Sequence, residues 1–431
     1  MKKPLPYVLN ILLSLLSTPL FASHGMGGEI TWKCQGTQYI FEMRFYRDCN
    51  GIPGPSNPVL ETNVPGVPTI PLIQISITDI SPQGDPNSGP MVCPVCPLGG
   101  GMGGGAGAVH EYLYRSNPVT LPGTPPPSGW LFAWGECCRS NAITNLIGSG
   151  GLSMGLRAVM YPFTGFVAGQ CNDNSPYFAE KPIVIACTGL PIEYNHFAND
   201  VEFDSLVYSW SYPVTEPPIS TLIFSAGYSI SSPLPSQIQN PANIPVTLNQ
   251  ATGSITFTSF NSGYFATVVQ VSSYRCGELT AEIFREINIV LNTLCIIPVA
   301  GNPHNQQPVI PPPIQDTLGN MMYNTTVTAG DTIAFTLTAN DNAPHPFSLL
   351  QDVELVANSL QFGTAFTDPN NGCIIPPCAT LNPAPPVAAA GSASTDFHWV
   401  TDAAHLGFSF NCVQFNNVYS FLFKAKDNYC P

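Results

Sequence analysis

The chain has 431 residues, of which 13 are basic and 27 acidic, so its formal net charge is −14. This charge repels the phosphate backbone of nucleic acids and argues against nucleic-acid binding. Charged residues make up only 9 % of the chain, against about 25 % in typical soluble proteins, and its 45 prolines and 37 glycines disfavour long helices.

The N-terminus has the features of a secretory signal peptide. Lys2 and Lys3 form a basic start, a short apolar run follows, and the small residue Ala22 precedes the expected cleavage site. We therefore expect residues 1–22 to be a signal peptide and the protein to be secreted or located on the cell surface. Later apolar runs stay below about 18 residues, so we expect no transmembrane segment.

The cysteines fall into three groups of even number along the chain, and an exported chain with 14 cysteines is expected to contain disulfide bonds. We expect each part of the chain to close its own bridges. The candidates are Cys34, Cys49, Cys93, Cys96, Cys137, Cys138, Cys171, Cys187, Cys276, Cys295, Cys373, Cys378, Cys412 and Cys430. The expected pairing joins Cys34 to Cys49 and Cys93 to Cys96, and leaves Cys171 and Cys187 as partners for the adjacent Cys137 and Cys138, which cannot easily bridge each other.

Alternating residues predict β-strands in the first part of the chain. The stretch "YIFEMRFY" sets Tyr39, Phe41, Met43 and Phe45 on one face, and "IPLIQISITDI" repeats this period of two. The stretch "GMGG" before the first strand predicts a flexible leader. The glycine-rich run at 99–108 lacks the Lys-Ser/Thr ending of a phosphate loop and predicts a mobile surface loop. We expect residues 23–190 to form a Cys-rich β-sandwich.

Two further blocks of strands follow. "GSITFT", "GYFATVVQVSSY" and "EIFREINIVL" predict strands divided by turns, with Ile287, Ile289 and Leu291 on one face of the last. This spacing is typical of a β-sandwich, which we expect over residues 191–298. A proline-rich run at 298–313 predicts an extended linker. Residues 299–431 are expected to form another sandwich, truncated at its C-terminus. In it, Ile333, Phe335 and Leu337 share one face of a strand, and Tyr419, Phe421, Phe423 and Ala425 share one face of another.

Several motifs resemble a known group of proteins. "SHGMGGEITWKCQGTQYIFEMRFYRDCNG", "CCRSNAITNL", "CNDNSPYF" and "PIVIAC" resemble the N-terminal region of large secreted surface proteins of gliding, Bacteroidota-type bacteria, which carry immunoglobulin-, PKD- or cadherin-like repeats. "DVEFDSLVYSW", "REINIVLNTLC", "IPPCATLNP" and "KAKDNYCP" extend the resemblance over nearly the whole mature chain. The C-terminal sorting domain of that group is not in this sequence, so we expect further domains in a longer chain.

The resemblance implies export by the type IX route and a role in adhesion or gliding-motility-associated surface display, without enzyme activity. Together with the strand pattern, it predicts an all-β rod of tandem, disulfide-containing immunoglobulin- or cadherin-like sandwiches. Its ligand would be a surface polysaccharide or a protein. The alternative is a secreted glycan-binding module of a larger carbohydrate-processing protein.

Carboxylates near strand ends suggest calcium binding. Asp200, Glu202 and Asp204 alternate before a strand, and Asp341 and Asp427 close two later strands. Calcium takes several oxygen ligands from such segments, and the cadherin-like repeats that these blocks resemble bind calcium at domain junctions. The alternative interpretation is that these residues are turn formers and solvated acids. Calcium is the one cofactor that the sequence suggests.

Two motifs match patterns that occur at catalytic sites. "GLSMG" matches the nucleophile-elbow pattern around Ser153, but that elbow needs a preceding strand, a following helix and an α/β sheet. "CPVC" at Cys93 and Cys96 could form a redox pair or half of a zinc site, but its prolines disfavour the helix that a redox motif needs. We expect a glycine turn at Ser153 and a disulfide at the two cysteines.

Overall fold

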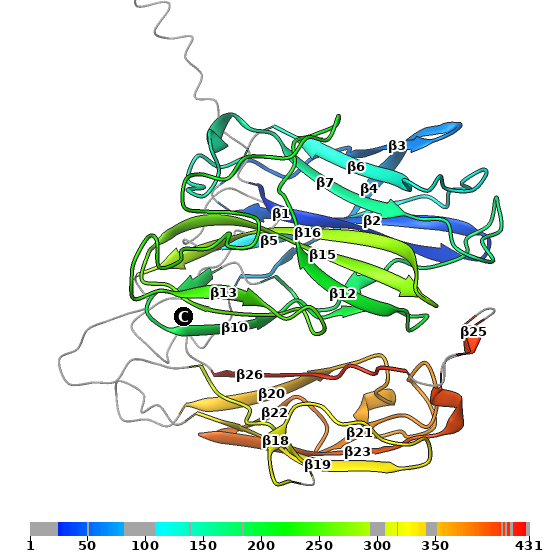
Figure 1. Ribbon diagram of the computed structural model, residues 1–431, viewed down its shortest axis with the longest axis vertical. Coiled ribbons are helices and arrows are strands. Elements are labelled where there is room, and N and C mark those ends of the chain that lie inside the picture. The colour runs from blue at the N-terminus through cyan, green and yellow to red at the C-terminus, as the bar shows by residue number, and fades with distance from the viewer. Residues whose placement is uncertain are drawn as a thin grey trace, which may run out of the picture.

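The computed structural model describes residues 25–49, 51–81, 108–137, 139–182, 185–293, 307–316, 318–341, 351–406, 408–409, 412–413 and 417–427 (Figure 1). These residues form β-strands joined by loops, with short 3₁₀ turns at Ser149–Gly151, Thr364–Phe366 and Ala403–His405. The predicted all-β class is confirmed. The expected signal peptide, Cys93, Cys96 and nearly all of the glycine-rich run lie outside the described residues.

Eleven strands form one large sheet, in which every pairing is antiparallel except that of β9 with β16. Its strands in sheet order are β1 (Gly25–Gln35), β2 (Gln38–Asp48), β5 (Val109–Ser116), β4 (Val67–Asp79), β3 (Val59–Val64), β6 (Trp130–Glu136), β7 (Met154–Met160), β16 (Glu278–Asn292), β15 (Gly263–Arg275) and β12 (Ser205–Trp210), with β9 (Ile185–Cys187) beside β16.

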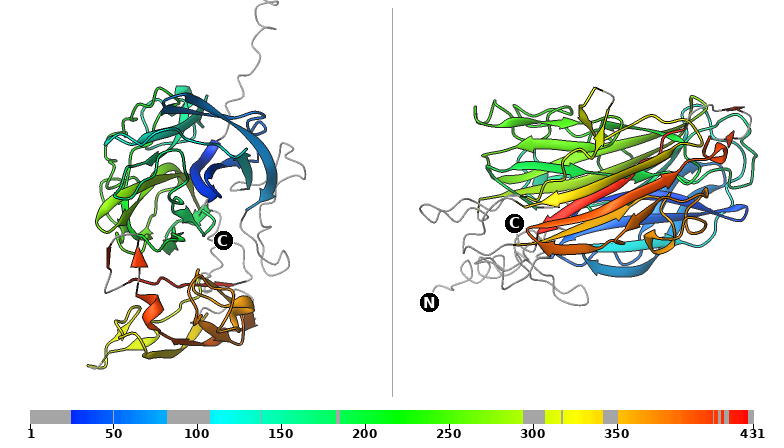
Figure 2. Two further views of the ribbon diagram at one scale, coloured as in Figure 1. Left: turned by 90° about the vertical axis from the view of Figure 1, so that its right-hand side faces the viewer. Right: turned by 90° about the horizontal axis from the view of Figure 1, so that it is seen from below.

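This sheet closes on itself. Strand β16 pairs with β7 through residues 281–283 and with β1 through residues 285–287. The eight strands β1, β2, β5, β4, β3, β6, β7 and β16 therefore form a closed circuit, which we call the barrel (Figure 2). Its interior is a dense aromatic core that includes Trp32, Phe41, Phe132 and Trp134. Phe41 lies in β2, and the inward face predicted for "YIFEMRFY" is confirmed, because Tyr39, Phe41, Met43 and Phe45 all belong to this core.

Glycines make the closure possible. The "GMGG" stretch is the buried start of β1, so the prediction of a flexible leader was wrong. Gly27 has φ +137°, and a Cβ built on it would lie 1.9 Å from the carbonyl oxygen of Glu286 in β16. A Cβ on Gly28 would lie 2.4 Å from the carbonyl oxygen of Arg44 in β2. A side chain at either position would therefore push β1 away from its two neighbours.

A smaller sheet covers the outside of the barrel wall. It contains β10 (Pro191–Asn195), β14 (Ser254–Thr258) and β13 (Ile244–Leu248), and β8 (Tyr177–Phe178) pairs with β11 (Ala198–Asn199) nearby. Ile192 and Phe257 of this sheet pack in a second core with Ile287 and Ile289 of β16 and Phe265 of β15. The expected boundary between residues 190 and 191 was wrong, because β12, β15 and β16 belong to the same sheet as β1–β7.

Residues 307–427 form the C-terminal module, which has its own core (Figure 1). Two three-stranded sheets face each other, as expected for a β-sandwich. Tyr419, Phe421, Phe423 and Ala425 pack against its core as predicted. One sheet contains β19 (Thr332–Asn340), β23 (Ser392–Val400) and β21 (Thr380–Asn382), and the other contains β22 (Val387–Ala390), β20 (Asp352–Asn358) and β26 (Leu422–Asp427). Two small pairs complete the module. In them, β17 (Ile314–Gln315) pairs with β18 (Met321–Met322), and β24 (Phe408–Ser409) pairs with β25 (Cys412–Val413).

The barrel-containing part of the protein and the C-terminal module each contain a disulfide bond of their own. Cys34 pairs with Cys171, 137 residues away, and Cys373 pairs with Cys378. The expected Cys34–Cys49 bridge was wrong, and so was the assignment of Cys171 to Cys137 or Cys138. No free thiol occurs among the cysteines in the described ranges. Within those ranges, no helix has the length and apolar character needed to cross a membrane.

Candidate functional site

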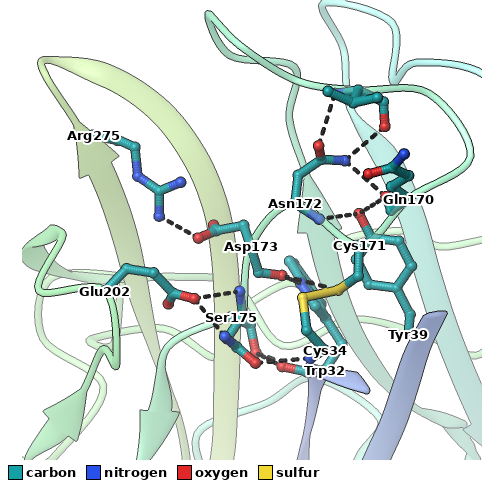
Figure 3. The surroundings of a disulfide bond; sticks show 12 residues. Trp32, Cys34, Tyr39, Gln170, Cys171, Asn172, Asp173, Ser175, Glu202 and Arg275 are labelled. Carbon is teal, nitrogen blue, oxygen red and sulfur yellow. Dashed lines mark hydrogen bonds and ion pairs between the residues drawn. A yellow bond between two sulfur atoms is a disulfide. The ribbon is translucent and has the colours of Figure 1, made fainter. Parts of the chain in front are cut away.

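The long-range disulfide lies beside a buried charge cluster at one end of the barrel. The segment after Cys171 is tied to β1, because the Ser175 N–H donates to the Trp32 carbonyl at 3.0 Å and the Ser175 hydroxyl accepts from the Trp32 N–H at 2.9 Å. Figure 3 shows Asp173, in the same segment, pointing towards Arg275. The disulfide therefore fixes the position of one carboxylate of this cluster.

Two buried aspartates bind one guanidinium, and a third aspartate lies beside them. Arg275 donates to both carboxylate oxygens of Asp204 at 2.9 Å and also to Asp173. Asp200 lies beside them, because the Ser273 hydroxyl is 3.4 Å from Asp200 and 3.3 Å from Asp204. We call Asp173, Asp200, Asp204 and Arg275 the acid cluster.

The acid cluster contains three carboxyl groups and one guanidinium, and the pKa values of Asp200 and Asp173 are raised. Burial raises the pKa of Asp200 well above its ordinary value, and the nearby carboxylates of Asp204 and Glu202 raise it further. Burial likewise raises the pKa of Asp173, although Arg275 opposes the shift. A proton shared within the cluster lowers the electrostatic cost of burying three carboxylates with one cation.

The structure divides the five expected calcium ligands between two places. Asp200, Glu202 and Asp204 lie at the acid cluster, where Arg275 already supplies a positive charge, and Asp341 and Asp427 lie in the C-terminal module. Over the described part of the chain, no three His, Cys, Asp or Glu side chains are arranged to hold a metal ion. Calcium binding stays a prediction, which an unchanged melting temperature in excess calcium and in chelator would contradict.

An open cavity of about 390 Å³ lies on the long segment between β12 and β13. Tyr212 and Phe224 meet there with their ring centroids 6.2 Å apart and their planes tilted by 43°. Ile223 is 71 % exposed. Among the described residues, the cavity is lined by Tyr212, Thr221, Leu222, Ile223, Phe224, Ser229 and Ile230. None of these side chains carries a charge at neutral pH.

A buried arginine holds one end of this segment against the barrel. Arg139 forms an ion pair with Glu286 of β16, and it also donates to the carbonyl oxygens of Val214 at 2.7 Å and Ser153 at 3.1 Å. The N–H of Gly155 donates to the same Val214 carbonyl at 2.9 Å. The peptide beside the cavity is therefore fixed to two barrel strands.

A buried asparagine holds the other end. The Asn145 amide donates to the carbonyl oxygens of Pro233 and Ala266, both at 2.8 Å, and its oxygen accepts the Ala266 N–H at 2.9 Å. Leu222 packs in a small core with Leu146 and Ala266. Arg139 and Asn145 both belong to "CCRSNAITNL", so this motif anchors the segment that carries the cavity.

The "GLSMG" stretch has a different role from a nucleophile elbow. Strand β7 begins directly after Ser153, where the elbow requires a helix. The Ser153 hydroxyl accepts the N–H of Glu216 at 3.0 Å. Ser153 therefore helps to hold the segment between β12 and β13.

Sequence reasoning missed the cavity. Its residues lie in a proline-rich segment without alternation. The one signal for them is a run of apolar and hydroxyl residues in "STLIFSAGYSISS".

No protein-family model matches the chain, and no curated protein matches its sequence.

Proposed function

We propose that this protein is a non-enzymatic, extracellular surface protein that acts in adhesion or gliding-motility-associated surface display and is exported by the type IX route. The observation that carries the proposal is the open cavity lined by Tyr212, Ile223 and Phe224 on a cross-linked β-scaffold. The cavity is the contact site for a ligand on a neighbouring surface, and the modules hold it away from the cell.

The scaffold suits an oxidising location. Disulfides such as Cys34–Cys171 persist in secreted and surface proteins and are reduced in the cytosol of most organisms. A bridge over 137 residues also restricts the unfolded chain strongly. These properties support a protein that works outside the cell, where proteases and changing conditions select for rigid domains.

The chemistry of the cavity favours an uncharged ligand. Its volume of about 390 Å³ lies within the range of about 300–1,000 Å³ that is usual for small-ligand sites. Apolar side chains form most of the lining, and the hydroxyls of Thr221 and Ser229 add donors and acceptors without charge. A charged group bound there would lose water without gaining an opposite charge.

A glycan-binding module of a larger carbohydrate-processing protein is the second candidate. The Tyr212 and Phe224 rings favour it, because tilted aromatic faces can pack on the apolar faces of sugar rings while hydroxyls bind the sugar edges. Both candidates use the same cavity, and they differ in the ligand and in the protein to which the module belongs.

The test uses the secreted full chain and a matched pair of exposed isoleucines on one segment. Ile223 lines the cavity and is 71 % exposed, whereas Ile238 is 78 % exposed and lies outside the lining. We expect Ile223→Asp and Tyr212→Ala to lower binding to cell surfaces and to a glycan array at least tenfold, and Ile238→Asp to bind like the wild type. Normal binding by Ile223→Asp would contradict the assigned site.

Two further readouts separate the candidates. Cell fractionation is expected to find the protein on the cell surface or in the medium, and retention in the cytoplasm would contradict the proposal. Cavity-dependent binding to purified neutral glycans supports the glycan-binding module. Cavity-dependent binding only to protein-bearing surfaces supports the adhesin with a protein ligand.

A further inference from the structure

A tight turn next to the acid cluster presents an aromatic ring away from the barrel. Phe203 has φ +58°, a left-handed conformation that is strained for a large side chain. Its N–H donates to the Asp200 carbonyl at 3.2 Å. The Asp200 carboxylate also accepts the N–H groups of Glu202 at 3.0 Å and Asp204 at 3.1 Å. Asp200 therefore bonds the backbone N–H groups of Glu202, Phe203 and Asp204 in the turn 200–204.

The ring of Phe203 meets the C-terminal module. Its centroid lies 5.0 Å from that of Tyr419, with the ring planes tilted by 58°. Tyr419 is itself held firmly, because its hydroxyl donates to the His405 carbonyl at 2.8 Å and its ring packs edge-on against Trp399 at 5.0 Å. The contact thus joins two side chains that are each fixed by their own module.

An ion pair provides a second contact between the same two parts. Lys424 Nζ in β26 lies 3.3 Å from a carboxylate oxygen of Glu180, which precedes β9. The carbonyl group of Glu180 accepts a hydrogen bond at 2.9 Å from Arg285 of β16. Figure 1 shows β26 on the side of the C-terminal module that faces the barrel. Two points of contact define an orientation better than one.

From these contacts we infer that the turn 200–204 is a docking joint, which holds the C-terminal module of this chain against the barrel through Phe203. A bulky residue in a left-handed conformation is strained, and it persists only where the surroundings fix it. Here the acid cluster fixes it, since Asp204 is bonded to Arg275 and Asp200 bonds the turn from within. The buried aspartates thus set the relative orientation of the two modules.

The test replaces Phe203 in ways that separate docking from folding. Phe203→Gly removes the ring and also the strain, because glycine adopts φ > 0 freely. Phe203→Tyr keeps a ring. Ile73→Ala is the control, since Ile73 is 54 % exposed on β4, which lies on the side of the barrel away from the C-terminal module (Figure 1).

Two measurements report the orientation. Carbodiimide cross-linking followed by mass spectrometry gives the yield of the Glu180–Lys424 link, and small-angle scattering gives the maximum dimension of the full chain. For Phe203→Gly we expect at least a threefold lower yield and a larger dimension, with the melting temperature of the barrel unchanged or higher. Phe203→Tyr and Ile73→Ala are expected to match the wild type.

The inference is overturned if Phe203→Gly keeps the wild-type cross-link yield and dimension. It is also overturned if the wild-type chain gives no Glu180–Lys424 link while its two parts scatter as independent bodies. Because neither readout involves a ligand, failure of the adhesion proposal leaves this result unaffected.

Discussion

Asp204 accepts two hydrogen bonds of 2.9 Å from Arg275 although both side chains are buried. The pair joins the turn before β12 to the end of β15. Through Asp173 it also reaches the segment that carries the long-range disulfide (Figure 3). Three distant parts of the sequence therefore depend on one guanidinium.

Removing one partner of this ion pair should destabilise the protein strongly. Asp204→Asn leaves Arg275 with fewer charged acceptors in a buried place, and we expect the free energy of unfolding to fall by about 3 kcal/mol. Denaturant unfolding, followed by tryptophan fluorescence, measures the change. Glu61→Gln is the control, because Glu61 is exposed on β3 and lies outside the acid cluster. Equal stability of both variants would contradict the structural role of the cluster.

The acid cluster should also make stability depend on pH. The folded state raises the pKa of Asp200, so it binds the proton more tightly than the unfolded state does. The free energy of unfolding therefore falls as the pH rises from about 4 towards the raised pKa. Asp200→Asn keeps the oxygen that accepts the two turn N–H groups and removes the charge. We expect melting temperatures measured between about pH 4 and pH 8 to fall less steeply in this variant, and an unchanged slope would refute the assignment.

The glycines of the first strand should tolerate no side chain. In Gly27→Ala the new Cβ would meet the backbone of Glu286 at 1.9 Å, so β1 would separate from β16. We expect no soluble folded protein, or a loss of at least about 3 kcal/mol. Gly36→Ala is the control, since Gly36 has φ +61° in the β1–β2 turn and open space around its Cβ position. Its cost should stay near 1 kcal/mol, and similar losses at both sites would contradict the explanation by closure.

The two disulfides should differ in their contribution. In the chain-entropy account, a bridge over a long loop stabilises by about 4–5 kcal/mol, and one over a very short loop by much less. Replacing both Cys34 and Cys171 by Ser should therefore lower the free energy of unfolding by several kcal/mol. The same change at Cys373 and Cys378, which are five residues apart, should cost only about 2 kcal/mol in this account. The reverse order, measured by calorimetry, would argue against the entropic explanation.

Individual strands and their inward faces were predictable, whereas their partners were not. The alternation in "YIFEMRFY" gave the buried face of β2 because a strand exposes successive side chains to opposite sides. The pairing of β1 with β16, more than 250 residues away, has no local signal. The same holds for the Cys34–Cys171 bond, where proximity in sequence suggested Cys49 instead.

In the candidate sites, too, single residues were predictable from the sequence but their distant partners were not. Asp200 and Asp204 stood out as a group, but their partner Arg275 lies 71 residues beyond Asp204 and comes close only because β12 pairs with β15. The cavity at Tyr212 and Phe224 depends on Arg139 and Asn145, which hold its segment from a distant motif.

The sequence by itself determined the β-class, the strand faces and the abundance of disulfides, because periodicity and composition are local properties. Only the tertiary structure decided that residues before and after position 190 share one closed sheet, which cysteines pair, and what the glycines and buried charges do. These features depend on contacts between distant segments, and many strand orders satisfy the same local pattern. Steric fit at Gly27 and charge pairing at Arg275 select one of them.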